Sequence, residues 1–350
     1  MKKHKLPLYA LICASLLSGS AGASEIVGAG SSAAAPLYNA WAQDWSSVAG
    51  GILKYAPVGS SAGIKAIQEG KGDFGASDVP LPKEELDKHG LINFPVAISG
   101  IVPIVNLPGM PRGELRLSGT VLANILAGQI TQWNDPQIGA LNRGRALPNL
   151  PIHVIAREDG SGTTYVLSNY LGKVSEGWAK NFGNDFKIKW SASVKQVKGT
   201  SGMLEAVAAQ AGALGYAEYG QVESARLNYV RVANQKGRYP QPDAASFTAA
   251  LEGSAWSTAG KFEEMLTDAP SINAWPITGG TFIVMPKRVA DARRAETVLS
   301  FLTYGFAKCD AATAKQRWIP LPERTQARVV REMSRLTDAQ GGPLSWKLSY

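Results

Sequence analysis

Apolar positions recur along the chain with two different spacings, which predict strands and helices in alternation. Short runs rich in Val, Ile and aromatic residues predict strands at 25–28, 52–58, 74–77, 93–106, 153–157, 214–219, 229–232 and 282–285. Apolar residues three and four positions apart predict helices at 34–48, 62–68, 120–126, 163–171, 203–211, 288–303 and 324–336. Strands separated by helices indicate an α/β fold with largely parallel sheets.

The first 23 residues have the pattern of a secretory signal peptide. A basic start, Lys2 to Lys5, precedes an apolar stretch at 6–17 that is too short to anchor the chain, and the small residues 21–23 follow. We therefore expect cleavage between Ala23 and Ser24 and a mature protein in the periplasm. A buried N-terminal helix or a membrane anchor is the alternative interpretation of this segment.

Composition limits the remaining possibilities. The chain has 350 residues, 45% hydrophobic and 18% charged, which is enough for two domains or one large one. Removal of residues 1–23 takes away three lysines and no acidic residue, leaving 33 basic and 28 acidic side chains, a net charge of +5. This mild basic excess fits an anionic ligand. Because no basic run is interleaved with aromatic residues, we expect no nucleic-acid partner.

Cysteine usage points to a fold stabilised by its apolar core. Cys13 belongs to the predicted signal peptide, so Cys309 is the single cysteine of the mature chain. One cysteine cannot form an intramolecular disulfide. We expect Cys309, near the end of an apolar helix, to be a half-buried structural residue.

Three segments share one design, in which a strand is followed by small residues and then by a helix. They are the stretches 28–33 (GAGSSA), 58–63 (VGSSAG) and 157–164 (REDGSGTT). Each places backbone N–H groups and hydroxyls at a helix N-terminus, where the helix dipole also favours negative charge. A single such loop is explained by ordinary helix capping. Three in one chain, one of them beginning with Arg157, predict a site for a tetrahedral oxyanion.

Other kinds of site find little support in the sequence. The GAG of 28–30 begins like a dinucleotide-binding motif, but no acidic residue follows about 20 positions later at a strand end, and no P-loop motif is present. The two histidines of the mature chain, His89 and His153, lack partners at metal-ligand spacing, so no metal or other cofactor is expected. Ser161 lies between two glycines but not in the G-x-S-x-G pattern of serine hydrolases.

Six segments in a fixed order resemble a known family. They are 28–30 (GAG), 59–65 (GSSAGIK), 73–78 (DFGASD), 157–163 (REDGSGT), 215–219 (GYAEY) and 274–278 (AWPIT). In this order they are similar to the periplasmic phosphate-binding protein of the high-affinity phosphate ABC transporter. The resemblance covers nearly the whole mature chain, and its most specific parts are DFGASD and DGSGT.

The resemblance implies a two-lobed α/β periplasmic binding protein of the venus-flytrap, type II-like kind, with phosphate bound between the lobes. Lobe I would comprise 24–97 and 274–350, lobe II 98–273, with crossovers near 96–99 and 273–276. The ligand contacts that it implies come from both lobes and are Ser32, Ala33, Ser60, Asp78, Arg157, Ser161, Gly162 and Thr163. It also implies that Asp159 pairs with the binding arginine.

The first loop departs from the family pattern at two positions. Ser32 stands where the family usually has Thr, which keeps the hydroxyl. Ala33 stands where the family usually has Phe, so the backbone N–H remains but an apolar cover over the ligand is lost.

Charge and hydrogen-bonding chemistry favour the same roles. Near neutral pH phosphate still carries a proton, whereas sulfate carries none. An ionised Asp78 only accepts hydrogen bonds, so it would bind protonated phosphate and repel sulfate. The alternative role for Asp78 is that of a helix cap or a surface turn residue, and for Arg157 that of a surface residue paired with Glu158 or Asp159.

We therefore expect a monomeric receptor, not an enzyme, which binds inorganic phosphate and passes it to the membrane permease subunits of an ABC transporter. The alternatives are a receptor for another oxyanion such as arsenate or sulfate, an exported phosphatase-like enzyme, and an extracellular sensor or adhesive protein. Asp78 argues against sulfate but does not separate arsenate from phosphate.

Overall fold

The computed structural model describes residues 25–346. The predicted signal peptide and its cleavage site lie outside this range. The strands are β1 (Glu25–Gly30), β2 (Ile52–Ala56), β3 (Phe74–Ser77), β4 (Leu91–Val105), β5 (Arg116–Leu117), β6 (His153–Arg157), β7 (Lys195–Val197), β8 (Ala213–Glu218), β9 (Asn228–Tyr229), β10 (Arg231–Val232), β11 (Thr278–Pro286) and β12 (Ile319–Pro320). The helices are α1 (Ala35–Ala49), α2 (Ser60–Gln68), α3 (Lys83–His89), α4 (Gly119–Leu126), α5 (Pro136–Leu141), α6 (Gly162–Val174), α7 (Glu176–Asn181), α8 (Gly199–Ala209), α9 (Tyr219–Ser224), α10 (Ala244–Glu252), α11 (Ala255–Ala259), α12 (Ala292–Lys308), α13 (Asp310–Lys315) and α14 (Glu323–Met333).

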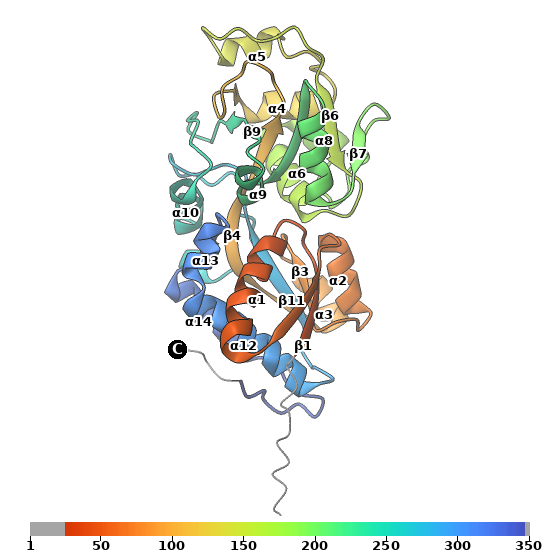
Figure 1. Cartoon of the computed structure of the whole chain (residues 1–350), viewed down its shortest axis with the longest axis vertical. Helices are drawn as coiled ribbons and strands as arrows, with labels where there is room; N and C mark the ends of the chain where they lie inside the picture. The colour runs from red at the N-terminus through yellow and green to blue at the C-terminus, as the bar shows by residue number, and fades with distance from the viewer. Residues whose placement is uncertain (1–24, 347–350) are drawn as a thin grey trace, which may run out of the picture.

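One long sheet connects two bodies of the molecule (Figure 1). Its strand order is β2-β1-β3-β11-β4-β8-β6-β7, with β9 and β12 also pairing with β4. The outer pairs β1–β2, β1–β3, β6–β7 and β6–β8 are parallel, whereas β3–β11, β11–β4 and β4–β8 are antiparallel. The predicted α/β class is confirmed, but the expectation of largely parallel sheets was wrong at the centre.

Strand β4 passes from one body into the other. Residues 91–100 pair with β11, and residues 101–105 pair with β8, so the strand exchanges its partner between Gly100 and Ile101. Apart from Asn93, every residue of β4 is buried. A strand covered on both faces needs no polar alternation, which explains its nearly continuous apolar sequence.

The first body, at the bottom of Figure 1, contains β1, β2, β3 and β11 with helices on both faces of the sheet. Helices α1 and α12 cover one face and bury Trp41 and Phe301. Helix α2 covers the other face with Ile64 and Ile67, which pack with Val284 of β11.

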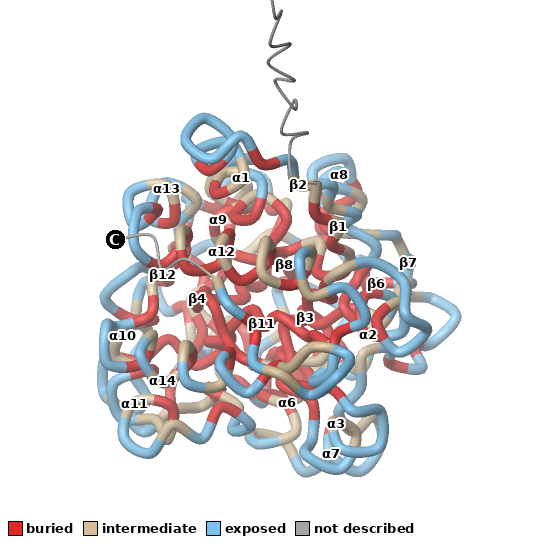
Figure 2. Tube along the Cα trace, turned by 90° about the horizontal axis from the view of Figure 1, so that it is seen from below, coloured by how far each residue is buried: buried red, intermediate tan, exposed pale blue. Residues whose placement is uncertain are grey.

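The second body contains β8, β6 and β7, with α8 packed on β6 and β8 and α4 packed on α6. Most buried apolar residues of the two bodies join in one continuous core, which forms the centre of the molecule in Figure 2, while the small cluster under α2 is separate. No disulfide supports this core in the described range, where Cys309 is a free and buried cysteine at the end of α12.

The most deeply buried tryptophans of the core have their indole N–H groups paired. Five tryptophans are almost completely buried, and each indole N–H donates a hydrogen bond. Trp275 is completely buried and donates to the carbonyl of Ile101 at 2.9 Å. Buried indole N–H groups generally need an acceptor. Here the acceptor lies where β4 exchanges partners, so the hydrogen bond joins the segment before β11 to that point.

Two local expectations were wrong. The helix predicted at 288–303 is α12, which begins at Ala292 because the carboxylate of Asp291 caps it by accepting from the N–H of Arg294. The strand predicted at 214–219 is β8, which ends at Glu218. All six residues of β8 are buried, and Tyr219 belongs to α9.

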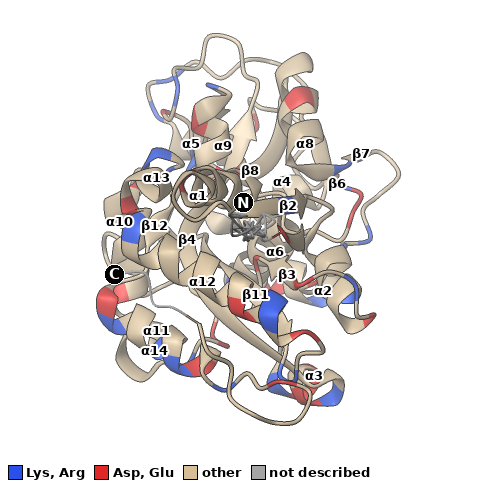
Figure 3. Cartoon of the chain, turned by 60° about the horizontal axis from the view of Figure 1, so that its bottom comes forward, with Lys and Arg blue, Asp and Glu red and all other residues tan. Residues whose placement is uncertain are grey.

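Basic and acidic residues are interspersed along the chain (Figure 3). Two arginines of the C-terminal helices are held by hydrogen bonds. Arg294 forms two hydrogen bonds to Asp73, and Arg328 donates to the backbone carbonyls of Trp256 and Ser257.

The contact between α1 and α12 depends on a glycine. A Cβ added to Gly305 would lie 2.2 Å from the Trp41 ring, which is buried and held by a 2.7 Å hydrogen bond from its indole N–H to Thr313. We predict that Gly305→Ala lowers the free energy of unfolding by about 1–3 kcal/mol in urea denaturation, because the ring cannot move aside. Gly172→Ala is the control, since Gly172 lies in α6 with no atom within 4 Å of an added Cβ. There the same change should stabilise by up to about 1 kcal/mol. Equal effects of the two substitutions would contradict this account.

Candidate anion-binding site

Four helices begin where the two bodies meet. Helices α1 and α2 belong to the first body, and α6 and α8 to the second. Helices α1, α2 and α8 have no side-chain cap, whereas Ser161 caps α6 by accepting from the N–H of Thr164 at 3.2 Å. Within the described chain, the backbone N–H groups at these helix starts that have no hydrogen-bond partner include five of interest here, those of Ser32, Ala33, Ser60, Gly162 and Thr163. All five belong to residues of the predicted site.

Hydrogen bonds join the two bodies around these N–H groups. The Ser32 hydroxyl of the first body lies 3.0 Å from the Thr200 hydroxyl and accepts from the Arg157 guanidinium at 3.2 Å. The N–H of Ser61 donates to the carbonyl of Gly160 at 3.1 Å. The structure therefore brings the three predicted loops together, across the boundary between the bodies.

Close approach explains why one position must be glycine. A Cβ on Gly162 would lie 2.4 Å from the Ser60 hydroxyl and 2.9 Å from Oδ2 of Asp78. Ser60 and Asp78 come from the first body and Gly162 from the second. Any side chain at Gly162 would push the bodies apart.

Arg157 is buried with its guanidinium paired to one carboxylate. Its Nε donates to Oδ1 of Asp159 at 2.7 Å, and its Nη2 donates to Oδ2. The predicted pairing with Asp159 is thus present. Partial burial acts to raise the pKa of Asp159, but the hydrogen bonds and charge of Arg157, together with the N–H of Gly199, hold it below its ordinary value. Asp159 fixes the guanidinium and reduces the net positive charge of the site.

Asp78 is a buried carboxyl without a direct ion-pair partner among the described residues. Its Oδ1 accepts from the Ser31 hydroxyl at 2.5 Å, and its N–H donates to Ser60 at 3.2 Å. Burial raises the pKa of Asp78 to about 6, against the lowering effects of Ser31, of the Arg157 charge and of Thr163. The alternative role as a surface turn residue is excluded, because Asp78 is only 5% exposed.

A second buried carboxyl, Glu218, lies at the end of β8 and was not predicted as part of the site. It accepts from the Ser99 hydroxyl at 2.5 Å and from the N–H groups of Gly220 and Gln221. Burial raises its pKa to about 7. By capping α9, Glu218 fixes the position of Gln221.

Gln221 is a residue that the sequence analysis missed. Its side-chain amide donates to the carbonyls of Ser32 and Ala33, at 2.9 and 2.8 Å, and so crosses from the second body to the first loop. Thr200 was missed as well, although the segment 198–203 (KGTSGM) repeats the design of small residues before a helix. Ser31 was not predicted either, because it is adjacent to Ser32 and the sequence does not show which of the two hydroxyls faces Asp78.

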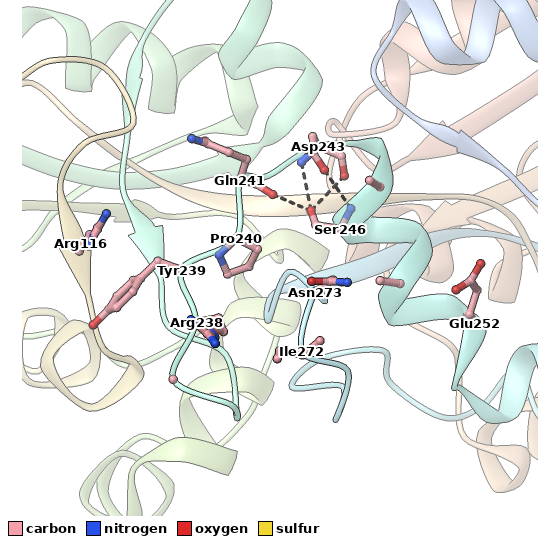
Figure 4. Close-up of a pocket in the computed structure, with 13 residues that line it drawn as sticks. Arg116, Arg238, Tyr239, Pro240, Gln241, Asp243, Ser246, Glu252, Ile272 and Asn273 are labelled. Carbon is pink, nitrogen blue, oxygen red and sulfur yellow. Dashed lines mark hydrogen bonds between the residues drawn. The ribbon is translucent and has the colours of Figure 1, made fainter.

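A wide cavity of about 1050 Å³ lies elsewhere, on the second body (Figure 4). Arg116, Arg238 and Tyr239 lie at one side of it and Glu252 at the other. It contains none of the predicted site residues. Its polar groups Asp243 and Ser246 are already bonded to each other as the cap of α10.

The described residues offer little for the alternative chemistries. His153 is exposed at the far end of β6 from Arg157, so it cannot act as a base for Ser161. Between residues 25 and 346 no three His, Cys, Asp or Glu side chains are grouped to hold a metal ion. Within the same range, no helix combines the length and apolarity needed to cross a membrane.

Comparison with known proteins assigns the class. Residues 18–314 match the model of the PBP superfamily domain. Solved structures with the same fold include a phosphate-binding protein from Stenotrophomonas maltophilia, with a TM-score of 0.69 at 22% identity over 87% of this chain and 92% of that one. Another is a high affinity periplasmic phosphate-binding protein (PfluDING) bound with phosphate, with a TM-score of 0.71 at 22% identity over 88% and 93%. The chain therefore has the two-lobed fold of a PBP superfamily protein.

Relatives at higher identity assign the family. The phosphate-binding protein PstS of Xylella fastidiosa (strain Temecula1 / ATCC 700964) is 39% identical over 85% of this chain and 82% of its own length. That of Pasteurella multocida (strain Pm70) is 35% identical over 93% and 94%. The chain belongs to the PstS family of phosphate-binding proteins, and it is accordingly a binding protein and not an enzyme.

The buried charge of Asp78 has a measurable effect on folding. Its pKa is about 6 in the folded protein and near 3.8 in an unfolded chain. Its contribution to stability is therefore complete below about pH 4 and is lost as the pH rises through 6. We predict that Asp78→Asn raises the free energy of unfolding of the ligand-free protein at pH 8 by up to about 3 kcal/mol, and by much less at pH 4. Urea denaturation at both pH values measures this. A difference between wild type and variant that is the same at the two values would refute the burial argument.

Proposed function

We propose that the mature protein is a periplasmic receptor that binds one inorganic phosphate between its two bodies and delivers it to the membrane subunits of an ABC transporter. The observation that carries this proposal is the meeting of unpaired N–H groups, the buried Arg157 and the buried Asp78 at one place between the bodies. The relatives of the PstS family bear the name of phosphate-binding proteins, and two of the related solved structures are described with phosphate bound.

The helix starts supply most of the binding energy in this proposal. The N–H groups of Ala33, Ser60, Gly162 and Thr163 and the hydroxyls of Ser32 and Ser161 donate to the phosphate oxygens, as predicted from the sequence. Helix dipoles and oriented amides stabilise an anion without a full opposing charge. Arg157 adds a rigid fork of donors, and Asp159 neutralises most of its charge.

Asp78 provides the selectivity. When ionised it accepts the proton of phosphate, whereas against sulfate it presents a buried charge without a donor. Arsenate has the same shape and a similar proton, so this mechanism does not exclude it.

The lobes that close on the ligand follow the predicted limits, 24–97 with 274–350 and 98–273. The exchange of partners in β4 at Gly100 and Ile101, and the hydrogen bond from Trp275 to Ile101, support crossovers close to those limits. In this proposal the two lobes close around phosphate, and the transporter recognises the closed form of the receptor.

Calorimetry tests the ligand and its selectivity together. We expect wild-type protein, stripped of ligand, to bind phosphate one to one at pH 8 and to bind no sulfate. Asp78→Asn supplies an amide that can donate, so sulfate affinity should increase at least tenfold, about 1.4 kcal/mol. Glu158→Gln is the matched control, because it removes an exposed carboxylate from the loop that begins with Arg157. Absence of heat with phosphate from folded wild-type protein would overturn the assignment of the ligand.

Gln221 should stabilise the closed arrangement. Its two hydrogen bonds to the carbonyls of Ser32 and Ala33 join the bodies without touching the N–H groups of the site. We predict that Gln221→Leu weakens phosphate binding roughly tenfold, mainly through faster dissociation measured by stopped-flow fluorescence. Gln210→Leu, an exposed position in the second body, should leave the rate unchanged. An unchanged dissociation rate in Gln221→Leu would show that these bonds do not hold the closed state.

A further inference from the structure

Ser31 is fixed beside Asp78 by every polar group it has. The residue lies between β1 and α1 and is 1% exposed. Its N–H donates to the carbonyl of Ala76 at 2.9 Å, and its own carbonyl accepts from the Tyr55 hydroxyl at 2.8 Å. These backbone bonds place the side chain against the carboxyl group of Asp78.

The direction of the Ser31 hydroxyl follows from its second partner. Its oxygen accepts from the N–H of Ala34 at 3.1 Å and lies 2.5 Å from Oδ1 of Asp78. Because the N–H of Ala34 is a donor only, the one hydroxyl proton of Ser31 is directed at Oδ1. The other carboxyl oxygen, Oδ2, faces Gly162 across the boundary between the bodies.

We propose that Ser31 is a selectivity-determining positioning residue, which occupies Oδ1 of Asp78, holds the carboxylate as an acceptor and directs Oδ2 towards the bound anion. This inference rests on the proposed function, since it assigns Ser31 a part in the rejection of a fully ionised oxyanion such as sulfate. Ser31 itself touches no ligand in this arrangement.

Several other groups around Asp78 influence its charge. Arg157, with its partner Asp159, faces it from the second body, as does Glu218 at the end of β8. The hydroxyls of Tyr38 on α1 and Tyr55 on β2 also lie near it, and both stay protonated because their pKa values are raised. Ser31 and Thr163 are the hydroxyl groups that lower the pKa of Asp78, and of these Ser31 forms the 2.5 Å bond.

Removal of the Ser31 donor should move the pH at which selectivity fails. Without it the carboxyl group takes up its proton at higher pH, and a protonated Asp78 can donate to sulfate. In Ser31→Ala we expect the midpoint of Asp78 protonation to move up by about one pH unit. Sulfate binding at pH 7 should then increase about fivefold over wild type, because the protonated fraction of Asp78 rises from about 9% to about 50%.

The experiment combines two measurements on ligand-stripped protein. Sulfate is titrated directly by calorimetry from pH 5 to pH 8, and the protonation of Asp78 is followed by the NMR shift of its carboxyl carbon, assigned with Asp78→Asn. Phosphate binding at pH 8 is measured for every variant.

Two further variants complete the test. Ser77→Ala is the matched control, because Ser77 is buried next to Asp78 but bonds the backbone of Val79 and not the carboxyl group. It should leave the midpoint and sulfate binding as in wild type. Ser31→Cys keeps nearly the same volume with a weaker donor, so its midpoint should lie between those of wild type and Ser31→Ala, and it serves if the alanine variant does not fold.

The possible failures are distinguishable. A wild-type protein that binds no phosphate overturns the proposed function and, with it, the role of Ser31 in selectivity. Normal phosphate binding with an unchanged Asp78 midpoint in the Ser31 variants overturns only the inference about Ser31. A shift of equal size in Ser77→Ala would show a general effect of packing and would also overturn it.

Discussion

The arrangement of the molecule depends on one strand that two bodies share. Strand β4 exchanges its partner from β11 to β8 between Gly100 and Ile101, and it is buried almost throughout. Because main-chain hydrogen bonds fix the register on both sides, the bodies cannot separate completely. Their relative position decides whether the helix starts on the two sides face each other. The indole of Trp275, bonded to the carbonyl of Ile101, secures this crossing from within the core.

The site between the bodies is nearly neutral although it is built for an anion. Arg157 is its buried cation, and Asp159 takes up most of that charge. What remains is a set of oriented N–H dipoles, which interact with a small anion at short range and need no metal ion. Asp78 opposes them with a buried negative charge whose pKa is raised to about 6 by burial. In the proposed function, attraction to an anion is combined with a requirement that the anion bring its own proton.

The sequence allowed the three glycine- and serine-rich loops to be located, together with the acid and the arginine beside them, because local patterns mark helix starts. Their resemblance to a family suggested eight ligand contacts and Asp159, and the structure brings the three loops together at the boundary between the bodies. The sequence did not predict three further residues, Thr200, Gln221 and Glu218, because each forms its hydrogen bond with a residue far away in the chain. Ser31 is different: it precedes Ser32 directly, and only the fold shows that its hydroxyl turns towards Asp78.

Hydrophobic periodicity by itself determined the α/β class, most of the strands and the longer helices, because burial of one face requires a matching spacing of apolar residues. The glycine- and serine-rich pattern before three of the helices located the loops of the candidate site. The antiparallel centre of the sheet, the exchange of partners in β4 and the pairing of loops across the two bodies were decided by tertiary structure alone. These features depend on contacts between residues more than a hundred positions apart, such as Gln221 with Ser32, which no local pattern encodes. The charge of Asp78 is likewise set by its surroundings, because burial and the neighbouring donors, not the residue type, fix its pKa.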